Sequence, residues 1–190
     1  MDYEYVSWET IQDICFILSE EIRFSGFKPD IIIGIARGGW PVARIIADLL
    51  DIKEMKSIQV KSYEDQKQSS KIIIEEDKKN LFIGKKVLIC EDIVDSGKSL
   101  NAIISRIEKN LLMGGILKTL AIFKKPNSDF TPDHYLQLQN DNWIIFPWEI
   151  NETFTSLRKQ WSQKNAYLFM QNAGVPKKIL DKLGVQNENT

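Results

Sequence analysis

The sequence predicts an α/β fold in which a central, mostly parallel sheet is flanked by helices. Two observations favour this class. Short apolar, β-branched runs alternate with amphipathic segments through the middle of the chain, which is the order of a parallel sheet with helical crossovers. The length of 190 residues, with 43% hydrophobic and 27% charged residues, suits one compact globular domain with modest additions.

The N-terminal part of the chain predicts a helix, a strand and a second helix. Apolar residues recur at steps of three and four over residues 8–22, and Ser7 can cap the helix that this spacing predicts. Residues 31–35 contain no polar side chain, which is typical of a strand buried on both faces. Pro41 is well placed at the first position of the next helix, which we expect to reach about Leu50.

The middle of the chain continues this alternation. Residues 55–63 alternate between apolar and polar side chains and predict a strand. The wholly polar residues 64–70 predict a loop, and a strand over 71–74 follows it. A buried strand over residues 87–90 and an amphipathic helix that reaches about Met113 come next.

The C-terminal part predicts three strands and then helices. Residues 117–123 form an apolar run typical of another buried strand. Weaker strand patterns cover residues 134–138 and 142–146. Residues 153–183 are mostly helical in pattern, with breaks at Gly174 and Pro176.

The most informative stretch is residues 87–100, which read VLICEDIVDSGKSL. Glu91 and Asp92 follow the predicted strand directly, and a third acid, Asp95, comes three residues later. Small residues and a lysine at 96–99 then open the next helix. Carboxylates at the carboxyl end of a strand can bind hydroxyl groups, and a helix N-terminus can bind a phosphate. The order therefore predicts a sugar phosphate as the ligand.

Two other interpretations of this stretch fit less well. A nucleotide-binding loop of the Walker type needs a glycine five residues before Gly97, and that position holds Asp92. An ordinary strand with a capped helix after it would account for Asp95 or Ser96 singly. It does not account for two adjacent carboxylates at the end of a buried strand.

The stretch resembles the motif with which type I phosphoribosyltransferases bind 5-phosphoribosyl 1-pyrophosphate (PRPP). That motif is a hydrophobic strand, an acidic pair, two residues, Asp, Ser or Thr, Gly, any residue, and Ser or Thr; every position is filled here. The resemblance runs in order from Asp30 to Glu149. It implies a type I phosphoribosyltransferase-like fold, with a small hood beside a mostly parallel sheet. It implies PRPP-binding roles for Glu91, Asp92, Asp95, Ser96, Gly97, Lys98 and Ser99.

A second matching segment directly follows the first predicted strand. It consists of Ala36, Arg37, Gly38 and Gly39. In the resembled family this loop holds the pyrophosphate of PRPP, often through a cis peptide bond, which here would join Ala36 and Arg37. The chemistry suits that role, because glycines let backbone amides approach an anion and arginine adds charged donors.

A third matching segment is Ser62 and Tyr63, at the head of the polar loop. The 6-oxopurine branch of the family carries Ser-Tyr on a flexible lid that closes over the reacting centre. Such a lid excludes water from a hydrolysable intermediate. Some relatives also have an arginine in the lid, whereas this chain offers Lys67 and Lys71 as cations for the leaving group.

The base-binding region resembles that of the bacterial and archaeal phosphoribosyltransferases for hypoxanthine, guanine and xanthine. Those enzymes have a Lys-Pro pair, followed by a Trp-Ile pair that comes before Pro, Trp and an acidic residue, and residues 125–149 show the same order. Lys125 can donate to the exocyclic oxygen at purine position 6, which adenine lacks. Trp143 offers a flat face for stacking, and the backbone carbonyl of Ile144 can meet the group at position 2. Glu149 occupies the position at which relatives often have an aspartate that is linked to the metal ion.

The resemblance implies a purine salvage enzyme. It would transfer the 5-phosphoribosyl group of PRPP to hypoxanthine, guanine or xanthine, giving the nucleoside 5′-monophosphate and pyrophosphate. Asp95 is the expected catalytic residue, as the proton partner of purine N7. Glu91 and Asp92 are expected to bind the ribose hydroxyls and to meet Mg²⁺ indirectly, through substrate or water. Mg²⁺ is the expected cofactor.

The expected domain organisation follows from the resemblance. We expect residues 1–150 to form the core and the base-binding hood, the hood coming mainly from 125–150 and the N-terminal helix. Residues 151–190 are expected to form a helical extension that packs on the core or at a dimer interface. Because the family is commonly dimeric or tetrameric, a homodimer or homotetramer is expected.

Composition argues against several classes of partner. The 25 basic and 26 acidic residues nearly cancel, so we expect no nucleic-acid or membrane surface. No apolar run approaches the roughly 20 residues that span a bilayer, and the N-terminus lacks signal-peptide character, so a cytoplasmic protein is expected. Cys15 and Cys90 lie in apolar segments without metal-ligand spacing and are expected to be small buried residues.

Two alternatives remain open from the sequence. One is a regulator that senses PRPP or a nucleotide with the same fold but without catalysis. The roughly 29 residues before the first predicted strand are too few for an added winged helix, and the charge is balanced, so the regulator is the weaker alternative. The other is a phosphoribosyltransferase for adenine, uracil or orotate, against which Lys125 and Trp143 argue.

Overall fold

The computed structural model describes residues 2–61, 71–73, 82–109, 111 and 114–185. The chain forms two compact units. The larger unit comprises residues 12–140, and the smaller unit comprises residues 1–11 and 141–190. None of the helices in the described ranges is long and apolar enough to cross a membrane.

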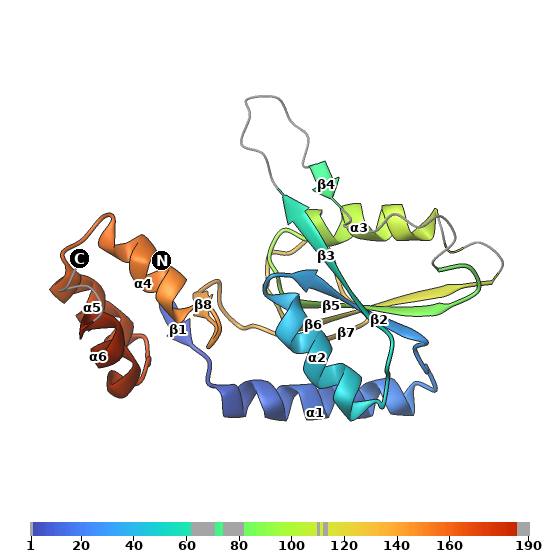
Figure 1. Cartoon of the computed structure of the whole chain (residues 1–190), viewed down its shortest axis with the longest axis horizontal. Coiled ribbons are helices and arrows are strands. Elements are labelled where there is room, and N and C mark those ends of the chain that lie inside the picture. Colours follow the sequence, from blue (N-terminus) through green and yellow to red (C-terminus); the bar gives the residue numbers. More distant parts are fainter. Residues whose placement is uncertain (1, 62–70, 74–81, 110, 112–113, 186–190) are drawn as a thin grey trace. The chain divides into compact units, whose positions relative to one another are not determined.

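The larger unit is built on a six-stranded sheet with the strand order β4-β3-β2-β5-β6-β7 within the described residues (Figure 1). Every neighbouring pair is parallel except β3 and β4. The prediction of a mostly parallel sheet is therefore confirmed. The strands are β2 (Ile31–Ala36), β3 (Met55–Lys61), β4 (Lys71–Ile73), β5 (Lys86–Val94), β6 (Ile116–Lys124) and β7 (His134–Gln137).

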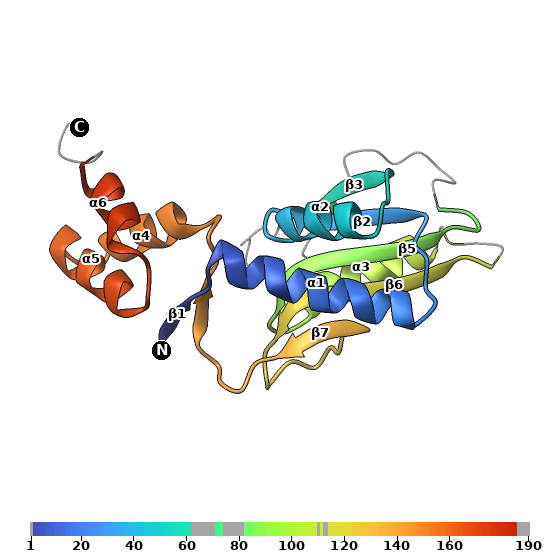
Figure 2. The same ribbon diagram turned by 90° about the horizontal axis from the view of Figure 1, so that it is seen from below.

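Helices cover both faces of this sheet, as Figures 1 and 2 show. α1 (Trp8–Phe24) and α2 (Gly39–Leu49) lie on one face, and α3 (Lys98–Glu108) lies on the other. Ser7 caps α1 as predicted, because its Oγ accepts a hydrogen bond from Thr10 N at 3.1 Å. The sheet is thus covered on both sides, which explains the unbroken apolar runs at residues 31–35 of β2 and 87–90 of β5.

The core under α3 fixes the start of that helix. Ile33, Ile89 and Ala121 of the sheet are buried against Leu100 and Ile103 of α3. Full burial of each large aliphatic side chain contributes about 1.5–3 kcal/mol. Because Leu100 lies in the first turn of α3, this packing holds the helix N-terminus at the carboxyl end of β5.

Two predicted boundaries differ from the structure. β5 extends to Val94 instead of ending at Cys90, because β6 continues to pair with it as far as Val94 opposite Lys124. The acidic pair therefore lies inside the strand. α3 ends at Glu108, short of the predicted Met113, because Leu111 N bonds to a carbonyl only three residues back, at 3.1 Å.

The smaller unit contains a two-stranded parallel sheet of β1 (Tyr3–Tyr5) and β8 (Trp143–Ile145) within the described residues. β1 was not predicted. Three helices complete this part of the structure, in the region where the sequence predicts helices: α4 (Ile150–Arg158), α5 (Gln163–Asn172) and α6 (Lys177–Val185). Their core includes Ile145, Phe154, Met170 and Leu180. The proposed division of the chain at residue 150 stays a prediction.

Candidate functional site

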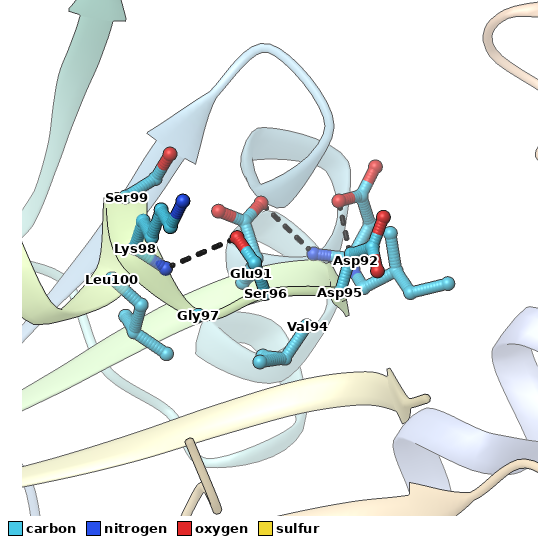
Figure 3. A pocket seen from close by; sticks show the side chains of 10 residues that line it. Glu91, Asp92, Val94, Asp95, Ser96, Gly97, Lys98, Ser99 and Leu100 are labelled. Carbon is cyan, nitrogen blue, oxygen red and sulfur yellow. Dashed lines mark hydrogen bonds between the residues drawn. The ribbon is translucent and has the colours of Figure 1, made fainter. Parts of the chain in front are cut away.

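A pocket of about 180 Å³ lies where β5 leads into α3 and is lined by residues 91–100 (Figure 3). Figure 3 shows the acidic, hydroxyl and lysine side chains on one side of this loop, while Val94 and Leu100 point the other way. Val94 and Leu100 are 2% exposed and belong to the core under α3. The apolar residues thus anchor the loop, and the polar ones face the pocket.

The acidic pair is held by backbone hydrogen bonds. Glu91 Oε1 accepts from Asp92 N at 3.1 Å, and Asp92 Oδ1 accepts from Ile93 N at 2.8 Å. Loss of solvation and then the charge of Asp92 raise the pKa of Glu91 well above its ordinary value. Two crowded carboxylates are stabilised by hydroxyl donors or by a cation, and a ribose ring with a metal ion offers both.

The third acid, Asp95, has a different environment. Its side chain is 71% exposed, whereas the neighbouring Lys125 side chain is 6% exposed. Lys125 Nζ lies 3.8 Å from Asp95 Oδ2. A ligand can therefore reach Asp95 from solvent, while the buried ammonium of Lys125 lies on its protein side.

The N-terminus of α3 has the shape of a turn that can bind an anion. Gly97 is the N-cap residue and has a φ of +74°, a conformation that favours glycine. Lys98 N lies 3.5 Å from Ser96 Oγ, and the first helical turn contains no acidic residue. A Cβ added at Gly97 would lie 2.3 Å from Phe130 Cβ. The turn therefore requires glycine for its conformation and for its packing.

The structure brings the predicted pyrophosphate loop against the acidic pair. The Ala36–Arg37 peptide bond is cis, as the resemblance implies. A Cβ at Gly38 would lie 1.7 Å from Asp92 Oδ2, and one at Gly39 would lie 2.3 Å from the carbonyl oxygen of Cys90. The loop after β2 and the end of β5 thus form one continuous surface.

Other predicted site residues fall elsewhere. Ser62 and Tyr63 lie outside the described residues, as does Lys67. Trp143 and Ile144 belong to β8 of the smaller unit, where Trp143 is 44% exposed and Ile144 is buried. The structure describes each unit separately, so the roles of Trp143 and Ile144 in base binding stay predictions.

Glu149 has a structural role in the smaller unit. It is the N-cap residue of α4, and its Oε1 accepts a hydrogen bond from Phe146 N at 3.3 Å. An acidic side chain at this end of a helix is also favoured by the helix dipole. These contacts account for an acid at position 149, and its link to a metal stays a prediction.

Two residues near the site were not assigned from the sequence. Phe130 packs against Gly97, a contact that no local pattern predicts. Lys124 is the last residue of β6 and is 7% exposed. Its position at the end of a buried strand, next to Lys125, was the signal that could have drawn attention to it.

The donor set fits a magnesium ion that is shared with substrate. Across the described ranges, no group of three or more His, Cys, Asp or Glu side chains is arranged to hold a metal. Glu91 and Asp92 supply adjacent carboxylate oxygens instead. Mg²⁺ commonly uses one or two carboxylates and completes its shell with water and substrate phosphates. A pair of acids beside the helix N-terminus at residues 96–99 suits that arrangement.

Comparisons with known proteins agree with this geometry. A family model for the phosphoribosyl transferase domain matches residues 4–172. A xanthine-guanine phosphoribosyltransferase of Cereibacter sphaeroides is 33% identical over 153 residues, which cover 77% of this chain and 86% of that protein.

Solved structures show the same fold. A purine phosphoribosyltransferase from Pyrococcus horikoshii is similar with a TM-score of 0.66 and 34% identity, over 78% of this chain and 94% of that one. The xanthine-guanine-hypoxanthine phosphoribosyltransferase of Helicobacter pylori has a TM-score of 0.67 over 83% of this chain and 99% of its own. At 22% identity, the latter supports the fold alone.

Proposed function

The chain belongs to the phosphoribosyl transferase family, and we propose that it transfers the 5-phosphoribosyl group of PRPP to a 6-oxopurine. It is a purine phosphoribosyltransferase of the salvage type, in line with relatives named as xanthine-guanine and purine phosphoribosyltransferases. The products are a nucleoside 5′-monophosphate and pyrophosphate. The observation that carries the proposal is the contact of the loop after β2 with the acidic pair of β5.

The surface at the end of β2 and β5 is proposed to bind PRPP in three parts. Backbone amides and hydroxyls of residues 96–99, at the N-terminus of α3, take the 5′-phosphate. Glu91 and Asp92 take the two ribose hydroxyls. Arg37 and the amides of Gly38 and Gly39 take the pyrophosphate. The order of these groups along the surface matches the order of groups in PRPP.

Mg²⁺ is proposed to bind with PRPP at Glu91 and Asp92, through substrate or water. When bound, the ion would offset the negative charge of the pyrophosphate leaving group. The protein's own contribution is the pair of carboxylates, which also favours positive charge on the ribose ring.

In the proposed reaction, a ring nitrogen of the purine forms a bond to the anomeric carbon as the bond from that carbon to the pyrophosphate oxygen breaks. The transition state carries positive charge on the ribose, beside Glu91 and Asp92. Asp95 is proposed to accept a hydrogen bond from purine N7 and to take its proton. Lys125 is proposed to donate to the oxygen at purine position 6.

A panel of nucleobases tests the activity. Hypoxanthine, guanine, xanthine, adenine, uracil and orotate are each incubated with PRPP and Mg²⁺, and the nucleotide formed is measured. The proposal expects nucleotide from at least one of the first three, with adenine the poorest purine. Nucleotide from orotate or uracil alone would contradict it. PRPP binding without any turnover would favour the regulator.

Location and assembly are also proposals. A cytoplasmic location suits an enzyme whose substrates are PRPP and purine bases. A homodimer or homotetramer suits a member of this family, and light scattering of the purified chain tests it. A strictly monomeric, active protein would contradict this assembly.

A further inference from the structure

Lys124 is a buried cation at the carboxyl edge of the sheet that the proposed chemistry does not use. It ends β6 and is 7% exposed. Its strand partner is Val94, the residue directly before Asp95. Its neighbour in sequence is Lys125, whose ammonium lies 3.8 Å from the Asp95 carboxylate. The backbone of Lys124 thus lies beside the residues that are proposed to contact the purine, Asp95 and Lys125.

The ammonium of Lys124 makes one long hydrogen bond within the described residues. Its hydrogen bond runs from Nζ to the carbonyl oxygen of Lys125 at 3.4 Å. That carbonyl already accepts from Ser128 N at 3.2 Å. Within the part of the chain that the structure describes, no carboxylate lies within ion-pair distance of Lys124. A buried charge without a close anion is unfavourable unless a ligand supplies one.

The backbone of Lys124 makes shorter hydrogen bonds than its side chain does. The carbonyl of Lys124 accepts from Leu138 N and from Gln137 Nε2, both at 3.0 Å. Lys125 N donates to the carbonyl of Val94 at 3.0 Å. The fold therefore fixes where the side chain of Lys124 starts. Only one 3.4 Å hydrogen bond would have to be given up for the ammonium to meet a better acceptor.

We infer that Lys124 is a specificity-determining residue whose ammonium binds an anionic oxopurine, and that it favours xanthine over hypoxanthine; this rests on the proposed function. The phosphate groups of PRPP have their own proposed donors at residues 36–39 and 96–99. The purine has one, Lys125. Among the 6-oxopurines, xanthine carries a second oxo group and most readily becomes an anion near neutral pH. A second buried cation next to Lys125 complements that additional charge.

The test compares Lys124→Met with Lys124→Arg. Methionine keeps the length of the side chain without charge, and arginine keeps the charge. We expect Lys124→Met to lower kcat/KM for xanthine relative to hypoxanthine by about tenfold, the loss of one charge-assisted hydrogen bond. The KM for PRPP should not change, and Lys124→Arg should retain most of the preference. An unchanged ratio, or an equal rise in the KM for PRPP, would overturn the inference.

Thermal unfolding separates this role from a structural one. Replacing a weakly satisfied buried charge by methionine should leave the melting temperature of Lys124→Met equal to or above that of the parent. A large fall in melting temperature in both variants would assign Lys124 to the fold instead. Lys85→Met is the matched control, because Lys85 is a half-buried lysine that pairs with Glu54 at 2.6 Å before β5 begins. It should not alter the xanthine to hypoxanthine ratio.

A binding measurement keeps this inference separate from the activity. If the parent protein makes no nucleotide from any oxopurine, the proposed function fails. Calorimetry with xanthosine and inosine 5′-monophosphates then decides the role of Lys124. The inference expects Lys124→Met to lose affinity for xanthosine monophosphate about tenfold more than for inosine monophosphate. Equal losses, or none, would overturn it.

Discussion

Gly38 lies directly against the carboxylate of Asp92, so closely that a Cβ at position 38 would be 1.7 Å from Asp92 Oδ2. Gly38 lies in the loop that follows β2, whereas Asp92 lies within β5. Their contact joins the proposed pyrophosphate loop to the proposed ribose-binding acids. The proposed PRPP-binding surface therefore depends on the absence of a side chain at this position.

Gly38→Ala should displace Asp92 and so misplace PRPP. Because a shift of about 1 Å at a reacting centre can cost about 100-fold in rate, we expect a loss of that order in kcat/KM for PRPP. Steady-state kinetics with PRPP as the varied substrate measures it. Gly184→Ala is the control, since a Cβ there would lie 3.9 Å from Gln163 Nε2, an ordinary van der Waals contact. Wild-type kinetics in Gly38→Ala would contradict the proposed contact.

Asp95→Asn should separate catalysis from PRPP binding. The side chain is 71% exposed and lies beside Lys125, so the amide can occupy the same place without creating a buried defect. Loss of the proton acceptor should lower kcat by about 100-fold or more. Calorimetry with PRPP and Mg²⁺ should give the parental affinity. An equal loss of kcat and of PRPP affinity would remove the proton role from Asp95.

Lys125→Met should weaken discrimination between purines. Its ammonium is the proposed donor to the oxygen at position 6, and adenine has an amino group there. We expect kcat/KM for hypoxanthine relative to adenine to fall by about tenfold or more. Competition assays that contain both bases measure the ratio directly. A ratio that stays the same would exclude Lys125 from recognition of the base.

Asp133 should contribute pH-dependent stability away from the site. Burial alone would raise the pKa of Asp133, but hydrogen bonds from Lys118 Nζ and from Thr119 N and Oγ1 outweigh it, so the pKa is lowered. A lowered pKa gives stability that is present above the unfolded-state value of about 3.9 and is lost as the pH falls through the folded-state value.

Asp133→Asn should therefore lower the free energy of unfolding at pH 7 by about 1 kcal/mol, less than a fully buried charged hydrogen bond contributes, because solvent screens the partly exposed carboxylate. The difference from the parent should shrink as the pH falls below about 4. Urea unfolding at pH 7 and at acid pH measures both values. A difference that does not depend on pH would show that the charge of Asp133 contributes nothing.

The sequence predicted the parts of the site that depend on short spacing. The acids of β5 and the turn at residues 96–99 lie within one stretch, so their shared edge follows from the order of strand and helix. The loop of residues 36–39 was placed there by the general rule that ligands bind at the carboxyl ends of parallel strands.

Long-range packing explains what the sequence did not reveal. β1 has three residues and pairs with β8 near the other end of the chain, so its strand form depends on a distant partner. The contact between Gly97 and Phe130 and the burial of Lys124 likewise arise only when β6 packs beside β5. The extension of β5 to Val94 has the same cause, because β6 continues to pair there.

Calorimetric titration of the folded protein with PRPP, in excess Mg²⁺, tests the central claim most directly. Saturable binding is predicted, and it should weaken at least tenfold in the double variant Glu91→Gln, Asp92→Asn, which removes two charged acceptors for the ribose hydroxyls. No detectable binding to the parent, or equal affinity in the double variant, would contradict the assignment of the acidic pair as the ribose site.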